Sequence, residues 1–181
     1  MLENTFQMGR QLLKEDPANA LVQQDLASIS ILVGSTFQQV GKAKDALSVL
    51  EPAMEIQRRA LVKSPGNRDA SYGLALLSMW SASCHKDLPD PPGALKDRRN
   101  AMEPLDRLVA QNPSNHAYVY GKAGNLRETG DLLATLGDSG AREYYRTGLE
   151  IAEKLPVGRA SLDRETLIAE LRDSLKRIDQ K

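Results

Sequence analysis

The sequence predicts an all-α protein built from three long helical hairpins that stack one after another. The first observation is a Pro-x-Asn triplet that recurs at a spacing of 48 residues, beginning at Pro17, Pro65 and Pro113. A fixed period of this size indicates stacked structural repeats. The second observation is that each unit carries helix breakers near its middle. The third is a pair of aligned columns that hold only small residues: Ala27, Ala75 and Ala123 in one, and Gly34, Ala82 and Gly130 in the other.

The Pro-x-Asn triplet marks the start of each unit, because Pro suits the first turn of a helix or the turn before it and Asn is a good N-cap. Gly41, residues 88–93 and residues 137–140 then divide the units into two helices each. The predicted units are 17–64, 65–112 and 113–160. Their predicted helices are Asn19–Val40 and Lys42–Lys63, Asn67–Asp87 and Ala94–Gln111, and Asn115–Leu136 and Ala141–Leu155.

The two small columns lie seven residues apart, which places them about two turns apart on one face of a helix. A residue that is small in every unit indicates that two helix backbones approach closely there. The sequence therefore predicts a close seam along the first helix of each hairpin. In the third unit the second helix is shifted by one residue, because Ala141 matches Ala46 and Ala94.

The two ends of the chain complete the array. Residues 2–16 align with the second helix of a unit, so we expect an N-terminal half-unit there. In segment 161–181, Asp163 and Glu165 suit the positive end of a helix dipole. An apolar stripe follows, so this segment is predicted to be an amphipathic capping helix. The whole chain, 1–181, is predicted to form one domain.

Composition excludes several classes of function. Lys plus Arg and Asp plus Glu both number 24, so the chain lacks the basic excess typical of nucleic-acid binding. No apolar run is long enough to span a bilayer, and the N-terminus does not resemble a secretory signal. The single cysteine allows no internal disulfide, so a cytoplasmic location is the simplest interpretation.

The residues also point to little chemistry. Cys84 and His85 are adjacent, and neighbours on a helix point about 100° apart, so they are not expected to act as nucleophile and base. His116 is the only other histidine, which leaves too few ligands for a zinc site. We therefore expect no catalytic residue, no metal and no cofactor, and the chain is not predicted to be an enzyme.

A longer motif adds a family resemblance. The segment Asp16-Pro17-Ala18-Asn19-Ala20-Leu21-Val22-Gln23-Gln24-Asp25-Leu26-Ala27 resembles the D-P-x-N-x-x-x-Q-x-D-L-A pattern of long-helix tetratricopeptide (TPR) repeat arrays. Such arrays occur in bacterial multidomain signalling proteins, often after a Ser/Thr protein kinase domain. The usual TPR unit has about 34 residues, so each helix here would be about two turns longer. The resemblance covers essentially the whole chain and implies a right-handed superhelix. The Pro-rich turn of the second unit departs from the family pattern.

The resemblance also implies a concave groove lined by the first helices of the hairpins. Aromatic residues make large contacts at little entropic cost, so Tyr72, Trp80 and Tyr120 are expected anchors. The alternative for Tyr72 and Trp80 is that they fill gaps between hairpins. The expected groove residues are Gln24, Ser28, Tyr72, Trp80, Tyr120 and Arg127, with Leu21, Ile31, Leu32, Asp69, Leu76, Met79, Ala117, Gly124 and Glu128 at neighbouring positions.

Two functions remain open from the sequence. The first is a non-catalytic scaffold that binds a peptide or protein segment in the groove, as the C-terminal part of a larger bacterial signalling protein whose catalytic domain would lie upstream. The second is a structural or oligomerisation module that packs on its own upstream domain or on itself, for example as a homodimer through the N-terminal half-unit. Neither involves nucleic acid or membrane insertion.

Overall fold

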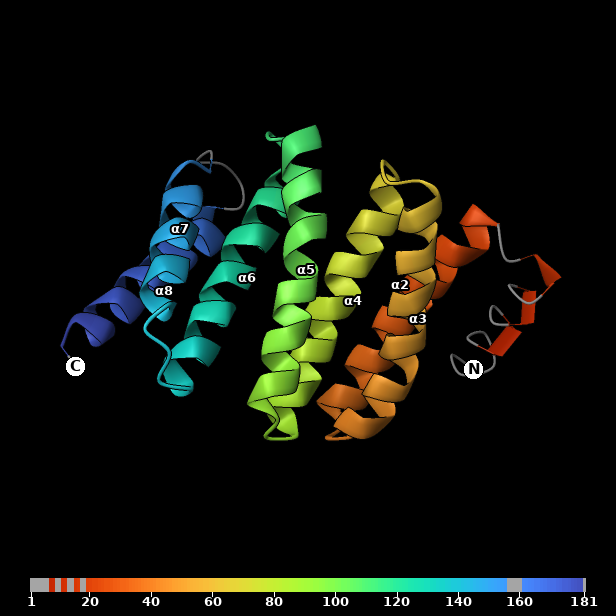
Figure 1. The fold of residues 1–181 in the computed structure, drawn as a ribbon, viewed down its shortest axis with the longest axis horizontal. Helices are drawn as coiled ribbons and strands as arrows, with labels where there is room; N and C mark the ends of the chain where they lie inside the picture. The colour runs from red at the N-terminus through yellow and green to blue at the C-terminus, as the bar shows by residue number, and fades with distance from the viewer. Residues whose placement is uncertain (1–6, 9–10, 13–14, 17–18, 156–160, 181) are drawn as a thin grey trace. The chain divides into compact units, whose positions relative to one another are not determined.

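The computed structural model describes residues 7–8, 11–12, 15–16, 19–155 and 161–180. The described chain contains seven helices and no strand, which confirms the predicted all-α class (Figure 1). The helices are α2 (Ala20–Gln39), α3 (Ala43–Lys63), α4 (Arg68–Asp87), α5 (Pro91–Gln111), α6 (His116–Thr135), α7 (Ala141–Glu153) and α8 (Ser161–Asp179). The half-unit predicted at 2–16 lies largely outside the described residues, so it stays a prediction, as does a homodimer formed through it.

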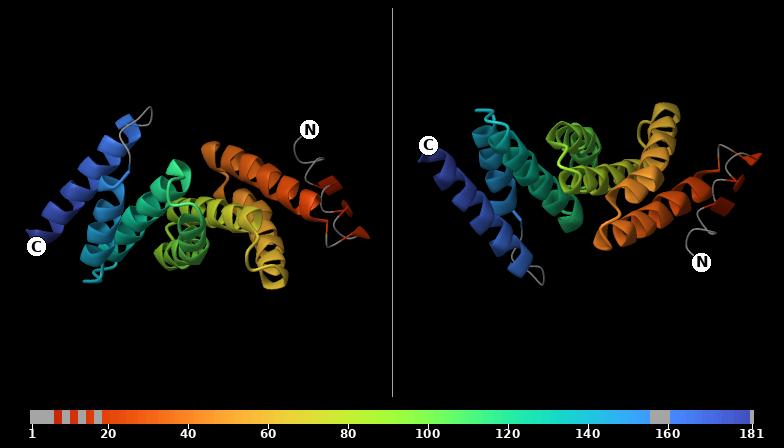
Figure 2. Two further views of the ribbon diagram at one scale, coloured as in Figure 1. Left: turned by 90° about the horizontal axis from the view of Figure 1, so that it is seen from above. Right: turned by 90° about the horizontal axis from the view of Figure 1, so that it is seen from below.

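The chain forms two compact units, 1–104 and 105–181, and the boundary falls inside α5. In the first unit α2 packs against α3, and α4 packs against both of them. In the second unit α6 packs against α7, and α8 packs against both of them, as the two views in Figure 2 show. The same three-helix arrangement therefore occurs once in each unit, and α8 takes the place of the first helix of a further hairpin.

The three Pro-x-Asn triplets start helices in the same way. The Oδ1 atoms of Asn19, Asn67 and Asn115 accept hydrogen bonds from the backbone N–H three residues later, at 3.1, 3.0 and 3.3 Å. All three asparagines have extended backbone angles, with φ between −66° and −74°. These geometries are those of N-caps, which satisfy one of the unpaired amides at a helix start.

Glycine ends the first helix of two hairpins. Gly41 and Gly137 have φ of +76° and +74°, a left-handed conformation that glycine adopts without steric cost. The amide of the residue after each glycine donates to the carbonyl oxygen five residues earlier, from Lys42 to Phe37 and from Asp138 to Leu133. This pattern closes the C-terminus of a helix.

The predicted start of α5 was wrong by one turn. We expected the helix to begin at Ala94, but it begins at Pro91. Asp90 is the reason: its Oδ1 accepts a hydrogen bond from the Gly93 amide at 3.0 Å, so Asp90 caps the helix and Pro91 occupies the first position. The predicted end of α7 was also too late, because the helix ends at Glu153 rather than at Leu155.

The small columns lie where helices approach each other. A Cβ added to Gly34 would lie 2.8 Å from Leu50 Cγ, and one added to Gly130 would lie 2.6 Å from the Tyr145 ring. Ala75, Ala82 and Ala123 are fully buried. The small columns therefore face buried side chains of the neighbouring helix, and a larger residue there would overlap Leu50 or Tyr145. The close approach of two helix backbones stays a prediction.

Candidate functional site: a pocket at the N-terminal ends of α2 and α4

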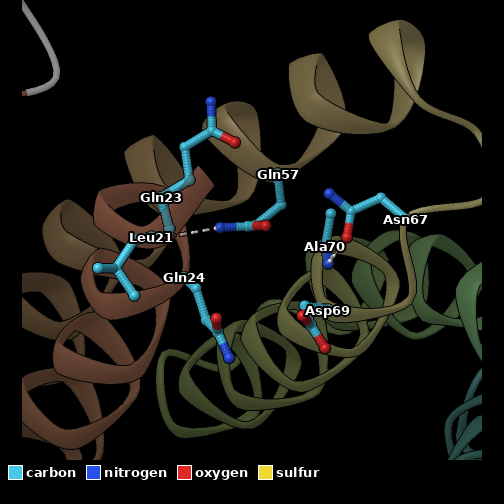
Figure 3. A pocket seen from close by; sticks show the side chains of 7 residues that line it. All are labelled: Leu21, Gln23, Gln24, Gln57, Asn67, Asp69 and Ala70. Atoms are coloured by element: carbon cyan, nitrogen blue, oxygen red, sulfur yellow. Dashed lines mark hydrogen bonds between the residues drawn. The ribbon is translucent and has the colours of Figure 1, made fainter. Parts of the chain in front are cut away.

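A pocket of about 190 Å³ lies in the first unit, between the N-terminal ends of α2 and α4 (Figure 3). We call it the amide pocket, because side-chain amides form most of its polar lining. The residues that line it are Leu21, Gln23, Gln24, Gln57, Asn67, Asp69 and Ala70.

Two helix starts and one long side chain build the pocket. Asn19 and Asn67 cap α2 and α4, which places the first turns of both helices at the pocket. Gln57 reaches in from α3, and its Nε2 donates to the backbone oxygen of Gln23 at 2.8 Å. The Gln57 side chain therefore links α3 to the first turn of α2.

Gly73 of α4 packs beside both α2 and the Gln57 side chain. A Cβ added to Gly73 would lie 3.4 Å both from Ala27 Cβ on α2 and from Gln57 Cδ on α3. These are ordinary van der Waals distances, so a methyl group at position 73 would touch both neighbours without displacing them.

The pocket is polar and weakly charged. Asp69, in the first turn of α4, is the only charged residue of its lining. Its carboxylate lies near the positive end of the α4 dipole. Leu21 supplies the apolar wall, and two thirds of its side chain is exposed.

The predicted groove residues fall into two groups in the first unit. Leu21, Gln24 and Asp69 line the amide pocket. Ser28 lies one turn further along α2, where it is exposed and its hydroxyl donates to the Gln24 backbone oxygen at 3.2 Å. Tyr72, one turn beyond Asp69, is 37% exposed, so it presents an aromatic surface beside the pocket.

Trp80 contributes to packing. It is partly buried and packs against the core cluster that contains Leu50, Leu74 and Leu77. The structure thus favours the gap-filling interpretation for this residue.

In the second unit, Arg127 is already engaged within the chain. Its guanidinium lies 2.7 Å from Glu128, 3.0 Å from Asp131 and 3.2 Å from Glu170 of α8. These contacts fix Arg127 between α6 and α8. Its place in the predicted groove stays a prediction, and these intramolecular ion pairs would compete with an acidic group of a partner.

Tyr120 lies on the same part of α6 and is partly buried. Its ring stacks on His116 with the ring centroids 6.0 Å apart. Burial, followed by the charges of Asp163 and Glu170, raises the pKa of Tyr120. The hydroxyl therefore stays protonated and can donate a hydrogen bond at neutral pH.

The residues with reactive side chains are used in helix packing. Cys84 is fully buried, and burial, followed by the charge of Asp87, raises the pKa of its thiol to about 11. A thiol of this kind is a weak nucleophile at neutral pH. No group of His, Cys, Asp and Glu suited to a metal ion occurs among the described residues.

His85 joins the end of α4 to the start of α5. Its Nδ1 lies 2.8 Å from Asp90 Oδ2 and its Nε2 lies 3.5 Å from Asp97 Oδ2. The Ser81 hydroxyl donates to the same Asp97 oxygen at 2.6 Å, so it is not directed at the imidazole. A Cβ on Gly93 would overlap both Asp90 and His85, which explains the glycine at the start of α5.

Sequence reasoning did not identify Gln57 as a functional residue, because it considered only first helices for the groove. A signal was nevertheless present in the repeat register. Gln57 aligns with Leu105 at the 48-residue spacing, so one copy of a core column holds an amide and the next holds a hydrocarbon side chain.

Comparisons with known proteins add little to this description. No protein-family model matches the sequence, and no curated protein matches it. Among solved structures, the chain is similar to the crystal structure of MamA, with 16% identity and a TM-score of 0.40 over 99% of this chain and 87% of that one. At this identity and TM-score the likeness does not establish a family. The evidence for the helical-hairpin fold is therefore the arrangement of the helices in this structure.

No described helix has both the length and the apolar character needed to cross a membrane.

Proposed function

We propose that the protein is a TPR-like scaffold that binds an extended peptide or protein segment along the face formed by α2 and α4. The observation that carries the proposal is the amide pocket, because it forms at three positions expected to line a binding groove: Leu21, Gln24 and Asp69. Binding sites combine apolar anchors with a few polar groups that fix orientation. The exposed side chains of Leu21 and Tyr72 supply apolar anchors beside the polar pocket.

The proposal includes the wider context given by the sequence resemblance. In that context the array belongs to a bacterial multidomain signalling protein and holds a partner segment near a catalytic domain. The interaction would be reversible, since a groove of this kind buries a short segment rather than a large interface.

The test uses a peptide selected by display on the full chain, with its dissociation constant measured by calorimetry. The double variant Leu21→Ala with Tyr72→Ala should weaken binding by about 2 kcal/mol or more, because both side chains are exposed anchors on one face. Its far-UV circular dichroism should stay that of the parent. Tyr120→Ala, alone and combined with Tyr72→Ala, reports whether the segment also reaches the second unit.

Val62→Ala is the matched control. Val62 is also an exposed apolar residue, at 83% exposure, but it lies on the second helix α3. Removing it should leave peptide affinity unchanged. Equal affinities for the parent, the double variant and the control would show that the groove face is not the binding surface.

A further inference from the structure

We infer that the amide pocket is a recognition site for a carboxamide group, supplied by an Asn or Gln side chain of the partner segment. The inference deepens the proposed function, on which it rests, by naming the chemistry that the groove selects. Its central residue is Gln57, which is 2% exposed and directs its amide group into the pocket (Figure 3).

The hydrogen bond to Gln23 uses only the Nε2 end of the Gln57 amide, and apolar packing alone does not require an amide at position 57. In the second unit Leu105 stands in the same column, and it approaches Gly121 as Gln57 approaches Gly73. A Cβ on Gly121 would lie 3.7 Å from Leu105 Cδ2, and a Cβ on Gly73 would lie 3.5 Å from Gln57 Cγ. A leucine therefore fits this environment, and a buried amide is costly unless its hydrogen bonds are made.

Only one end of the Gln57 amide has a partner among the described residues. The Nε2 atom donates to the Gln23 backbone oxygen at 2.8 Å. The Oε1 atom points away from α2, toward the start of α4, and no described residue donates to it (Figure 3). A nearly buried acceptor thus faces the pocket, where it can receive an N–H from a ligand.

The remaining lining residues select among N–H donors. Gln24 offers both a donor and an acceptor, which complements a carboxamide. An ammonium group is disfavoured, because the positive ends of the α2 and α4 dipoles both lie at the pocket. The same dipoles attract a carboxylate, but Asp69 repels it and the lining contains no Lys or Arg to pair with it.

The pocket also has the size and shape for such a side chain. Its volume of about 190 Å³ exceeds that of one or two waters, which take about 30 Å³ each. Leu21 can cover the methylene groups of the side chain, while Gln57 and Gln24 hold its amide. The site exists in the first unit and has no equivalent at Leu105.

The experiment titrates the full ¹⁵N-labelled chain with four small probes: propionamide, 2-butanone, propionate and propylammonium. Backbone and side-chain amide signals of Leu21, Gln24, Gln57 and Ala70 are followed. Propionamide should produce saturable shifts at these signals in the millimolar range, since so few atoms limit the affinity. The other three probes should bind at least about tenfold more weakly. An equal or stronger response to 2-butanone, propionate or propylammonium, or no response to any probe, would overturn the carboxamide assignment.

Gln57→Leu copies the residue of the second unit and should abolish the propionamide response while the rest of the spectrum is retained. The control is Gln39→Leu, because Gln39 is an exposed glutamine at the other end of α2. This variant should keep the propionamide response. If Gln57→Leu does not fold, Gln24→Trp fills the pocket from its exposed rim and should also abolish the response. A retained response in either folded variant overturns the inference. Peptide binding that depends on Leu21 and Tyr72 but not on Gln57 would leave the proposed function intact and remove only this site.

Discussion

At the scale of single residues, buried polar side chains do more than the sequence pattern indicates. Tyr145 is 2% exposed, and its hydroxyl donates to Asp131 Oδ1 at 2.8 Å. Asp131, on α6, also forms an ion pair with Arg127 of the same helix. Arg127 in turn contacts Glu170 of α8, so these side chains connect α6 to both α7 and α8. Gln57 plays a similar part in the first unit, where it links α3 to α2. Each such group joins helices through a hydrogen bond whose loss would leave a buried polar atom unpaired.

A prediction at this scale concerns Tyr145. Burial, followed by the hydrogen bond to Asp131, raises the pKa of Tyr145 to about 12, whereas an unfolded tyrosine ionises near pH 10. Between about pH 10 and 12 the unfolded chain therefore holds fewer protons than the folded protein, so the hydroxyl's contribution to stability is lost as pH rises through this range. Tyr145→Phe should lower the free energy of unfolding by about 1 kcal/mol near pH 8.

The measurement is urea unfolding of parent and variant at several pH values. The difference between them should shrink from pH 10 to pH 12, because only the parent has this group to ionise. Tyr144→Phe, one residue earlier in α7, is the control for general alkaline effects. A difference that stays constant over this range would contradict the assignment.

At the scale of helices, glycines and asparagines set both the ends and the spacing of the elements. Asn caps start α2, α4 and α6, and left-handed glycines end α2 and α6. Small residues on the same helices then allow their neighbours to approach. The sequence repeat is therefore a repeat of helix boundaries and contacts, which is why a period found in the residues appears again in the structure.

The prediction for helices compares two glycines. Gly34→Ala places a methyl group 2.8 Å from the fully buried Leu50, so overpacking should outweigh the gain in helix propensity and lower stability by about 1–2 kcal/mol. Gly66→Ala lies in a turn with no atom within 4 Å of the new methyl group. Its stability should be unchanged or slightly raised. Thermal unfolding followed by circular dichroism separates the two, and equal melting temperatures would mean that α2 and α3 are not held this closely.

At the scale of the whole molecule, α5 is the helix that belongs to both compact units. The boundary between the two units falls within this helix, at residues 104 and 105. In repeat proteins, neighbouring elements stabilise each other, so damage in one unit reduces the stability of the next.

This coupling can be tested with the single tryptophan. Gly130→Ala in the second unit would place a methyl group 2.6 Å from the Tyr145 ring and should destabilise α6 and α7. Trp80 reports on the first unit. We expect the urea midpoint from Trp80 fluorescence to fall together with that from circular dichroism. The units would be shown to unfold independently by two results together. The fluorescence midpoint would stay at the parent value, and circular dichroism would show an additional unfolding transition at lower urea concentration.

The helical class, the helix starts at the three asparagines and the need for small residues at the two aligned columns could be predicted from the sequence alone. These features depend on local backbone preferences and on side-chain size, which a repeat displays at every copy. The sequence failed at Asp90, because a capping carboxylate beside two prolines looked like a longer break. It also gave no sign of the ion pair between Arg127 and Glu170, because Glu170 lies 43 residues later in the chain on α8.

Only the tertiary structure decided where the amide pocket lies. The pocket requires the first turns of α2 and α4 to meet beside a side chain from α3, and no local pattern specifies that meeting. The 48-residue alignment places Gln57 and Leu105 at equivalent positions of two units. The difference between them became informative only once position 57 was known to be buried and to face a pocket. Helix boundaries follow from nearby residues, whereas a binding site depends on which distant residues packing brings together.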